Sequence, residues 1–89
     1  MGHAVRDVIT DDTITYAKMV CLDQKKRGGS LSDALAFIDA WHETFGRVNF
    51  YGASLSEMKA LVEQYWDSVT CPDPDVETKY YEMVARLYY

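Results

Sequence analysis

Apolar residues recur at intervals of three and four along most of the chain, which is the spacing of one face of an α-helix. Glycine and proline interrupt this pattern at a few places only, at positions 2, 28, 29, 46, 52, 72 and 74. The pattern therefore predicts a mainly α protein, a compact bundle of about four helices. The expected helices cover residues 11–27, 31–45, 54–69 and 74–88.

Each expected helix is preceded by a short polar side chain that can accept a hydrogen bond from the first turn. These residues are Thr10, Ser30, Ser54 and Asp73. Ser54 and Glu57 form a complete capping-box pattern, in which each side chain can reach the backbone amide of the other residue. At the end of the first helix three cations precede Gly28, which suits the negative end of the helix dipole.

The apolar faces predict one common core and hence a single domain over residues 1–89. In the second helix the inward face consists of Leu31, Ala34, Leu35, Ile38, Trp41 and Phe45. The other three helices contribute, in order, Ile14, Ala17, Val20 and Cys21; Leu55, Met58, Val62, Tyr65, Trp66 and Val69; and Val76, Tyr80, Met83, Val84 and Leu87. Burying a large apolar side chain contributes roughly 1.5–3 kcal/mol, so these faces can offset the entropy lost on folding.

Two short segments do not fit the helical pattern. Residues 4–9 and 47–51 are rich in β-branched and aromatic side chains, which favour extended structure. They can pair as a two-stranded ribbon or remain extended loops, because an isolated ribbon is only marginally stable.

Composition narrows the class of protein. With 9 basic and 14 acidic residues the net charge is -5, which disfavours a broad surface for nucleic acid. The first residues lack the apolar run of a secretory signal, and no stretch is apolar enough to span a membrane. Cys21 and Cys71 are too few for a disulfide-stapled domain. We therefore expect two free thiols in a reducing cytoplasm, with a single bridge between them as the alternative.

Patterns for catalysis and for metal binding are weak. His42, Cys21 and Cys71 lack the short spacings that bring zinc ligands together on one element. His42 is the only credible general base, and a chain of 89 residues leaves little room for a substrate cleft of several hundred cubic ångströms. We expect no enzyme activity, no metal and no cofactor.

The third expected helix opens with Gly52-Ala53-Ser54-Leu55, which resembles the Ser-Leu site of acyl and peptidyl carrier proteins over these four residues. The resemblance implies a serine that accepts a phosphopantetheine arm. The sequence departs from that pattern at Ala53, where carriers have Asp or His, and at 31–45, where carriers have a long loop. We favour the interpretation that Ser54 caps a helix.

A small DNA-binding regulator is another alternative, with residues 31–45 and 54–69 as a helix-turn-helix. A recognition helix needs Arg, Lys, Asn or Gln side chains toward the bases, and 54–69 carries only Lys59 and Gln64 among acidic residues. The one basic cluster consists of Lys18, Lys25, Lys26 and Arg27, and the helix dipole accounts for its position.

Aromatic content, at 13% of the residues, exceeds what one inward stripe per helix requires. Tyr and Trp are enriched at protein interfaces, and residues 48–89 hold 7 acidic against 3 basic side chains. The leading hypothesis is therefore a non-enzymatic protein that binds another protein as an inhibitor or adaptor. Immunity proteins, antitoxins and phage proteins that modulate a host are examples of this type.

The expected partner presents a basic or aromatic-accepting surface, and a homo-oligomeric assembly protein is the alternative. The candidate contact residues are Tyr51, Asp67, Asp73, Asp75, Glu77, Tyr81, Glu82, Tyr88 and Tyr89. All of them lie in the acidic C-terminal half of the chain.

Overall fold

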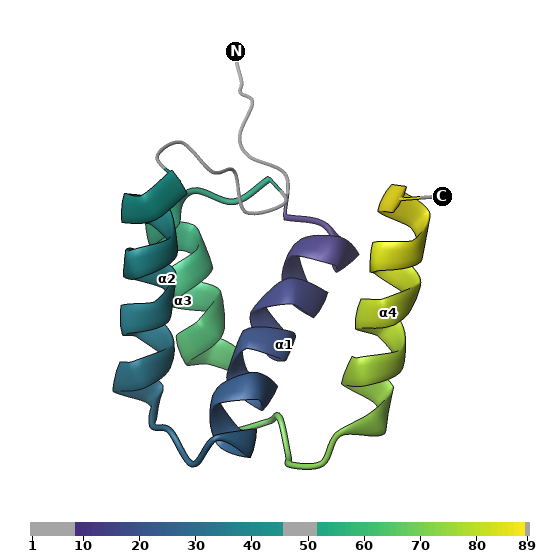
Figure 1. The fold of residues 1–89 in the computed structure, drawn as a ribbon, viewed down its shortest axis with the longest axis horizontal. Coiled ribbons are helices and arrows are strands. Elements are labelled where there is room, and N and C mark those ends of the chain that lie inside the picture. The colour runs from purple at the N-terminus through teal and green to yellow at the C-terminus, as the bar shows by residue number, and fades with distance from the viewer. Residues whose placement is uncertain (1–8, 46–51, 89) are drawn as a thin grey trace.

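The structure, a computed structural model, describes residues 9–45 and 52–88, with side chains up to residue 86 in the last helix. The described residues form four α-helices: α1 (Asp11–Lys26), α2 (Leu31–Phe45), α3 (Leu55–Tyr65) and α4 (Pro74–Tyr88). The predicted helical bundle is confirmed (Figure 1). The predicted ribbon of 4–9 and 47–51 falls outside the described residues except for Ile9, which lies in neither a helix nor a strand.

The helix starts are fixed by the side chains that the sequence indicates. The Thr10 amide donates to the Thr13 hydroxyl at 3.1 Å, and the Thr13 amide donates to the Thr10 hydroxyl at 3.3 Å. In α3 the Ser54 amide donates to a Glu57 carboxylate oxygen at 2.9 Å, and the Glu57 amide donates to Ser54 Oγ at 3.2 Å. Ser54 is therefore a helix cap, as expected, because its hydroxyl accepts a bond that the first turn would otherwise lack.

The end of α1 requires glycine. Gly28 has a φ of +76°, a left-handed conformation that other residues rarely adopt. Its amide donates to the Lys25 carbonyl at 3.2 Å, and the Gly29 amide donates to the Gln24 carbonyl at 2.7 Å. These two bonds satisfy carbonyls that the helix end leaves open, and they turn the chain toward α2.

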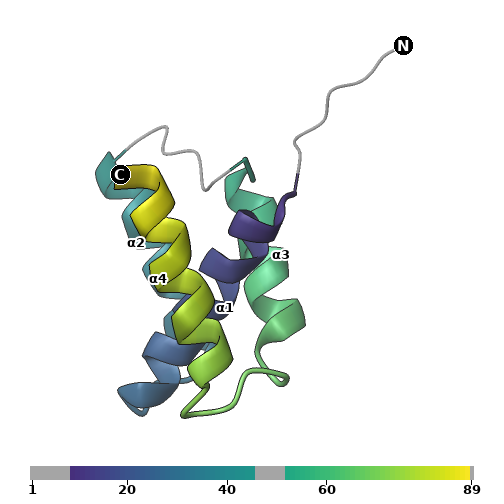
Figure 2. The same cartoon turned by 90° about the vertical axis from the view of Figure 1, so that its right-hand side faces the viewer.

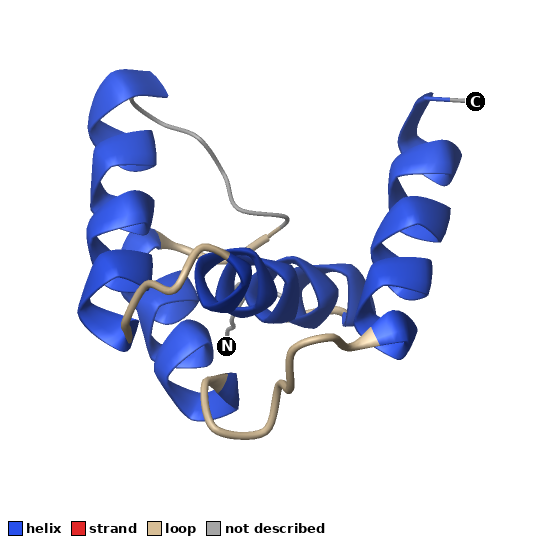
Figure 3. Cartoon of the chain, turned by 60° about the horizontal axis from the view of Figure 1, so that its bottom comes forward, coloured by secondary structure: helices blue, strands red, loops and turns tan. Residues whose placement is uncertain are grey.

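Helix α1 is the centre of the molecule. It packs against α2, α3 and α4, and α2 also packs against α3. Among the described residues α4 packs against α1 alone, and Figure 3 shows α4 on the other side of α1 from α2. Helices α1 and α3 run in one direction and α2 and α4 in the other, so α2 and α4 end at the same end of the molecule (Figures 1 and 2).

The main core lies where α1, α2 and α3 meet. Its buried members are Ala17, Val20, Cys21, Leu22, Ala34, Ile38, Ala53, Met58, Val62, Val69 and Val76. Helix α4 adds Val76 to this cluster, and its Met83 is also fully buried. The predicted inward faces of the first, third and fourth helices are largely confirmed by this set.

The third helix ends at Tyr65 and is therefore shorter than the predicted span 54–69. The chain turns there. The ammonium group of Lys25, on α1, donates hydrogen bonds to the carbonyls of Trp66 and Val69. The Lys25 ammonium also lies 4.8 Å from the centre of the Trp66 ring. A lysine from a distant helix therefore takes the place of further helical hydrogen bonds in this segment.

The predicted core face of α2 is wrong for two of its residues. Trp41 and Phe45 keep 36% and 57% of their surface exposed, whereas Ala34 and Ile38 on the same helix are fully buried. Helical spacing places all four on similar sides of α2. Among the described helices only α1 and α3 pack against α2, and they leave Trp41 and Phe45 partly exposed.

Candidate functional site

A cleft of about 570 Å³ runs along the junction of α1 and α4, next to the end of α3. Its lining residues are Asp11, Asp12, Ile14, Thr15, Lys18, Tyr65, Asp73, Asp75, Val76, Lys79, Glu82 and Arg86. The expectation that a chain of this length has no room for a cleft of several hundred cubic ångströms is therefore wrong. The open angle between α3 and α4 creates this space, because both helices pack on α1 but not on each other.

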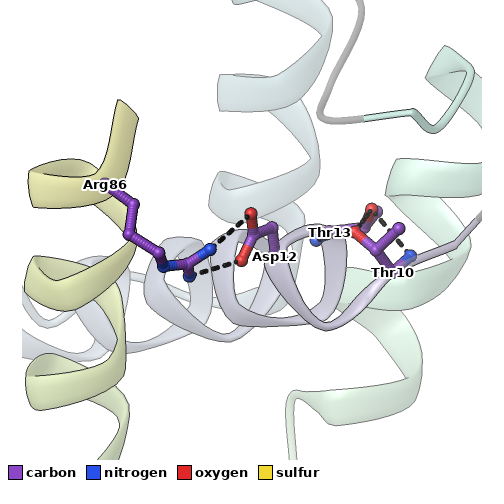
Figure 4. Close-up of polar contacts among 4 residues, drawn as sticks. All are labelled: Thr10, Asp12, Thr13 and Arg86. Carbon is purple, nitrogen blue, oxygen red and sulfur yellow. Dashed lines mark hydrogen bonds and ion pairs between the residues drawn. The ribbon is translucent and has the colours of Figure 1, made fainter. Parts of the chain in front are cut away.

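Four of the eight charged residues that line the cleft contact other groups of the protein. Arg86 binds the Asp12 carboxylate with both terminal guanidinium nitrogens, at 2.9 and 3.5 Å (Figure 4). This contact raises the pKa of Arg86 above its already high value. Asp73 accepts from the Val76 amide at 3.3 Å and so caps α4, and the Lys18 ammonium lies 5.0 Å from the centre of the Tyr65 ring. These four groups stabilise the fold, and the other charged residues of the lining are Asp11, Asp75, Lys79 and Glu82.

The lining of the cleft contains neither cysteine nor histidine. Cys21 is fully buried in the core and donates from Sγ to the Val62 carbonyl at 3.4 Å. Burial raises the pKa of the Cys21 thiol to about 11, which keeps it protonated and unreactive at neutral pH.

The candidate contacts from the sequence divide between two sides of α4. Asp73, Asp75 and Glu82 line the cleft. Glu77 lies on the other flank, where its carboxylate accepts from Lys26 at 2.8 Å and raises the pKa of that lysine. Tyr81, one turn beyond Glu77, is 60% exposed and stacks edge-on against Tyr80 at 5.7 Å. Asp67 is exposed in the turn that follows α3.

The remaining candidates cannot be placed as contacts. Tyr51 and Tyr89 lie outside the described residues, and Tyr88 belongs to the last turn of α4 with no side chain described. The structure therefore brings three of the nine candidates together in the cleft and leaves Tyr81 as an exposed aromatic residue nearby on the same helix.

Among the residues with described side chains, the largest exposed aromatic surface lies on α2, and it includes Trp41 and Phe45, which the sequence predicted to be core. Phe37, Trp41 and Phe45 follow each other at intervals of four, and their ring centres are 5.9 and 4.7 Å apart. Each keeps more than a third of its surface exposed. We call these three residues the aromatic stripe. It is continuous over about 12 Å of helix, given a rise of about 1.5 Å per residue.

The direction of the stripe follows from the buried residues of the same helix. Helical spacing places Trp41 and Phe45 on the side of α2 that carries the fully buried Ala34 and Ile38. The stripe therefore continues the core face of α2 toward the end of the helix, where that face is partly exposed. Asp39, which is paired with Lys59 of α3 at 3.1 Å, lies about 160° around the helix from Phe37 and Trp41.

The basic cluster that suggested DNA binding is engaged within the protein. Lys18 and Lys25 lie over the rings of Tyr65 and Trp66, Lys26 pairs with Glu77, and Arg27 pairs with Asp23 at 3.0 Å. Each cation of the cluster thus has an interaction within the protein, and the Arg27 side chain remains 70% exposed.

Other kinds of site can be assessed for the described part of the chain only. There, no group of three or more His, Cys, Asp and Glu side chains is arranged to hold a metal ion. No helix in that part combines the length and the hydropathy needed to cross a bilayer. Both cysteines are free thiols, with Cys21 buried and Cys71 exposed.

Comparisons of the chain with protein-family models, with curated proteins and with solved structures found no match. The arrangement of residues is therefore the basis for a functional conclusion.

Proposed function

We propose that the protein is a non-catalytic module that binds another protein, and that the aromatic stripe of α2 is the surface of contact. The observation that carries this proposal is the exposure of Phe37, Trp41 and Phe45 side by side on one helix. Scattered exposed apolar residues are ordinary, but adjacent aromatic rings are typical of the buried centre of an interface. An inhibitor or an adaptor in the cytoplasm is the role that we favour.

The size of the stripe indicates a modest affinity from apolar contact alone. At roughly 200 Å² per aromatic side chain, the exposed fractions leave about 260 Å² of stripe surface in water. Covering that surface contributes about 7 kcal/mol at 25 cal/mol per Å². Association costs about 4–15 kcal/mol in lost freedom of motion, so a specific complex needs further contacts around the stripe.

The cleft is the weaker candidate for a binding site. Asp12 and Arg86 bind each other and Asp73 caps α4, so a ligand that bound these groups would have to replace contacts that stabilise α4. No such contact has to be broken at the stripe. The C-terminal residues indicated by the sequence remain a prediction, and Tyr81 is the one among them whose described side chain is most exposed.

Photo-crosslinking in the native cells tests the proposal. A benzophenone-bearing phenylalanine replaces Trp41 in one variant and Gln64, an exposed residue of α3, in a control variant. Irradiation is expected to join position 41 to one other protein, visible as a discrete heavier band and identified by mass spectrometry. Position 64 is expected to give no such band.

Two results would contradict the proposal. The first is an absence of any crosslinked protein at position 41 when the variant is folded and present at its normal level. The second is a crosslink from position 41 to another copy of this chain alone, which would favour the homo-oligomeric alternative.

A further inference from the structure

We infer that α4 can leave its own chain and dock on α1 of a second copy, so that two chains exchange this helix and form a dimer. The inference goes beyond the proposed function, because it concerns the face of α4 that is buried on α1 and leaves the aromatic stripe in place. It follows from the single neighbour of α4, from the contacts that hold α4 and from the short segment that joins it to α3.

Helix α4 is attached to the described part of the molecule through one neighbouring helix. It packs on α1 alone, whereas α1, α2 and α3 each pack on the other two. Figure 3 shows α4 on the other side of α1 from α2. The packing of α1, α2 and α3 on one another therefore persists when α4 leaves. Elements of this kind open at a lower free energy than the whole molecule unfolds.

The buried face of α4 is apolar and narrow. Val76 and Met83 are the buried side chains among those described on this helix, and Tyr80 between them is half-buried. Their spacing of three and four places them on one side of α4. Exposing this face to water is unfavourable, so a detached α4 is stabilised by any surface that has the shape of α1. A second copy whose own α4 has left offers that surface.

Two ion pairs fix the direction in which α4 lies on α1. Lys26 Nζ is 2.8 Å from the Glu77 carboxylate, and Arg86 is 2.9 Å from the Asp12 carboxylate. One pair lies near each end of α4, and all four side chains are partly exposed to water. Exposed pairs of this kind contribute little to stability, so they orient the helix without locking it in place.

The connection between α3 and α4 is short. Lys25 binds the Val69 carbonyl and so holds the chain on α1 up to that residue. Only residues 70–73 then remain before α4 begins, and 70–72 are exposed. The Thr70 hydroxyl donates to the Pro72 carbonyl at 3.1 Å, a contact within the connection itself. Short connections favour exchange of the following element between copies, because they restrict how it folds back on its own chain.

A second copy of this chain is the occupant that loses no contacts. Each chain that gives up its α4 frees one face of α1, and the contacts between two exchanged chains are those that each chain makes alone. A helix of another protein would have to displace α4 without offering a place for it. The remaining cost is the lost independent motion of two chains, so the dimer increases with protein concentration.

Charge-reversal variants of the full chain test this inference. One variant carries Asp12→Arg and Lys26→Glu on α1, and the other carries Glu77→Lys and Arg86→Asp on α4. Each variant places like charges across its own α1–α4 contact, whereas exchange between the two variants restores opposite charges at all four contacts. Both variants keep the net charge of -5, because the two reversals in each cancel. Attraction between whole chains therefore does not favour the mixture.

The variants are unfolded in urea and refolded, separately and as an equal mixture at the same total concentration. Native mass spectrometry distinguishes the mixed dimer from the two homodimers, because the variants differ in mass. The mixture is expected to contain about ten times more dimer than either variant alone, since four exposed ion pairs together contribute about that factor. A control chain with all four changes restores both pairs within itself and is expected to form the same fraction of dimer as the wild type.

Two results would overturn the inference. The first is a mixture with no more dimer than the separate variants. The second is a mixed dimer that disappears when both variants also carry Trp41→Ala, because the contact between copies would then lie on α2.

A milder pair of variants serves if a doubly changed chain does not fold in the mixture. Asp12→Arg and Arg86→Asp, each as a single change, are expected to give about a threefold excess of mixed dimer, and no excess would again contradict the inference. Crosslinking at position 41 tests the proposed function separately, so the failure of either proposal leaves the other standing.

Discussion

Helices α2 and α4 have 15 residues each and run in the same direction, yet they are held in different ways. Helix α2 packs on both α1 and α3, and its aromatic stripe is left uncovered. Helix α4 packs on α1 alone, with Lys26–Glu77 and Asp12–Arg86 pairs on its two flanks. The helix that is better anchored is thus the one that exposes more aromatic surface.

This difference shows how a small bundle can combine stability with a binding surface. Ala34 and Ile38 anchor α2 in the core, so the exposed rings beyond them are presented on a rigid support. A rigid support limits the entropy lost when a partner binds. Helix α4 has fewer neighbours and relies partly on exposed ion pairs, which are a weaker anchor.

The first and largest expected effect separates the core of α2 from its stripe. Ile38→Ala is expected to lower the free energy of unfolding by about 2–5 kcal/mol, because a fully buried side chain leaves a cavity. Trp41→Ala is expected to cost less than Ile38→Ala, because the ring keeps 36% of its surface in water and its removal leaves no closed cavity. Urea unfolding followed by circular dichroism measures both. Equal costs would mean that Trp41 belongs to the core.

The second effect concerns the lysine that joins α1 to the segment between α3 and α4. Lys25→Met keeps the apolar stem and removes the donor to the carbonyls of Trp66 and Val69. A loss of about 1–3 kcal/mol is expected in the same unfolding experiment. Lys79→Met, a change of an exposed lysine on α4, serves as the control and is expected to alter stability little. A similar loss in both variants would refute the role given to Lys25.

The third effect is a loss of stability at high pH that arises from a buried thiol in the core. Burial raises the pKa of Cys21 from 9.0 to about 11, so the unfolded chain loses this proton at a lower pH than the folded protein does. Stability from this group is therefore complete below about pH 9 and declines as the pH rises toward 11. Unfolding of the wild type is compared with Cys21→Ala and Cys71→Ala. Only the Cys21 variant is expected to lose this part of the decline, and an unchanged pH profile would contradict the prediction.

The smallest effect concerns the anchoring of α4. Arg86→Gln removes the pair with Asp12 and is expected to speed amide exchange in α4 about two- to threefold, with α2 and α3 unaffected. Arg27→Gln, which removes a pair within α1 and its following turn, is the control. Salt is expected to reduce the difference between wild type and the Arg86 variant. Faster exchange throughout the molecule would show that α4 is as integral to the fold as α2.

The sequence predicted the helices well and the exposed aromatic surface of α2 poorly, for identifiable reasons. Caps such as Ser54 and the glycine at 28 act through local hydrogen bonds, so their positions can be recognised from neighbouring residues. The length of α3 depends on Lys25, which is 41 residues before Trp66 and shows no local signal. Periodicity identified the side of α2 that carries Trp41 but not how far α1 and α3 extend along it.

The sequence also directed attention to the tyrosines and carboxylates of the C-terminal half. Several of these groups have structural roles that require the fold to be known, such as Asp73 at the start of α4 and Glu77 with Lys26. The aromatic surplus predicted aromatic residues outside the core, and Tyr81 is one of them. Its largest exposed group, however, lies on α2, and the spacing of Phe37, Trp41 and Phe45 is the signal that could have indicated it.

The central claim is that α2, and not α4, carries the surface that binds a partner. It is tested most directly by measuring the affinity of the crosslinked partner for the wild type, for Trp41→Ala and for Tyr81→Ala. Each variant removes one exposed aromatic ring, the first from α2 and the second from α4. We expect Trp41→Ala to weaken binding at least tenfold and Tyr81→Ala to change it less than about threefold. The opposite order, or full affinity of the Trp41 variant, would contradict the claim.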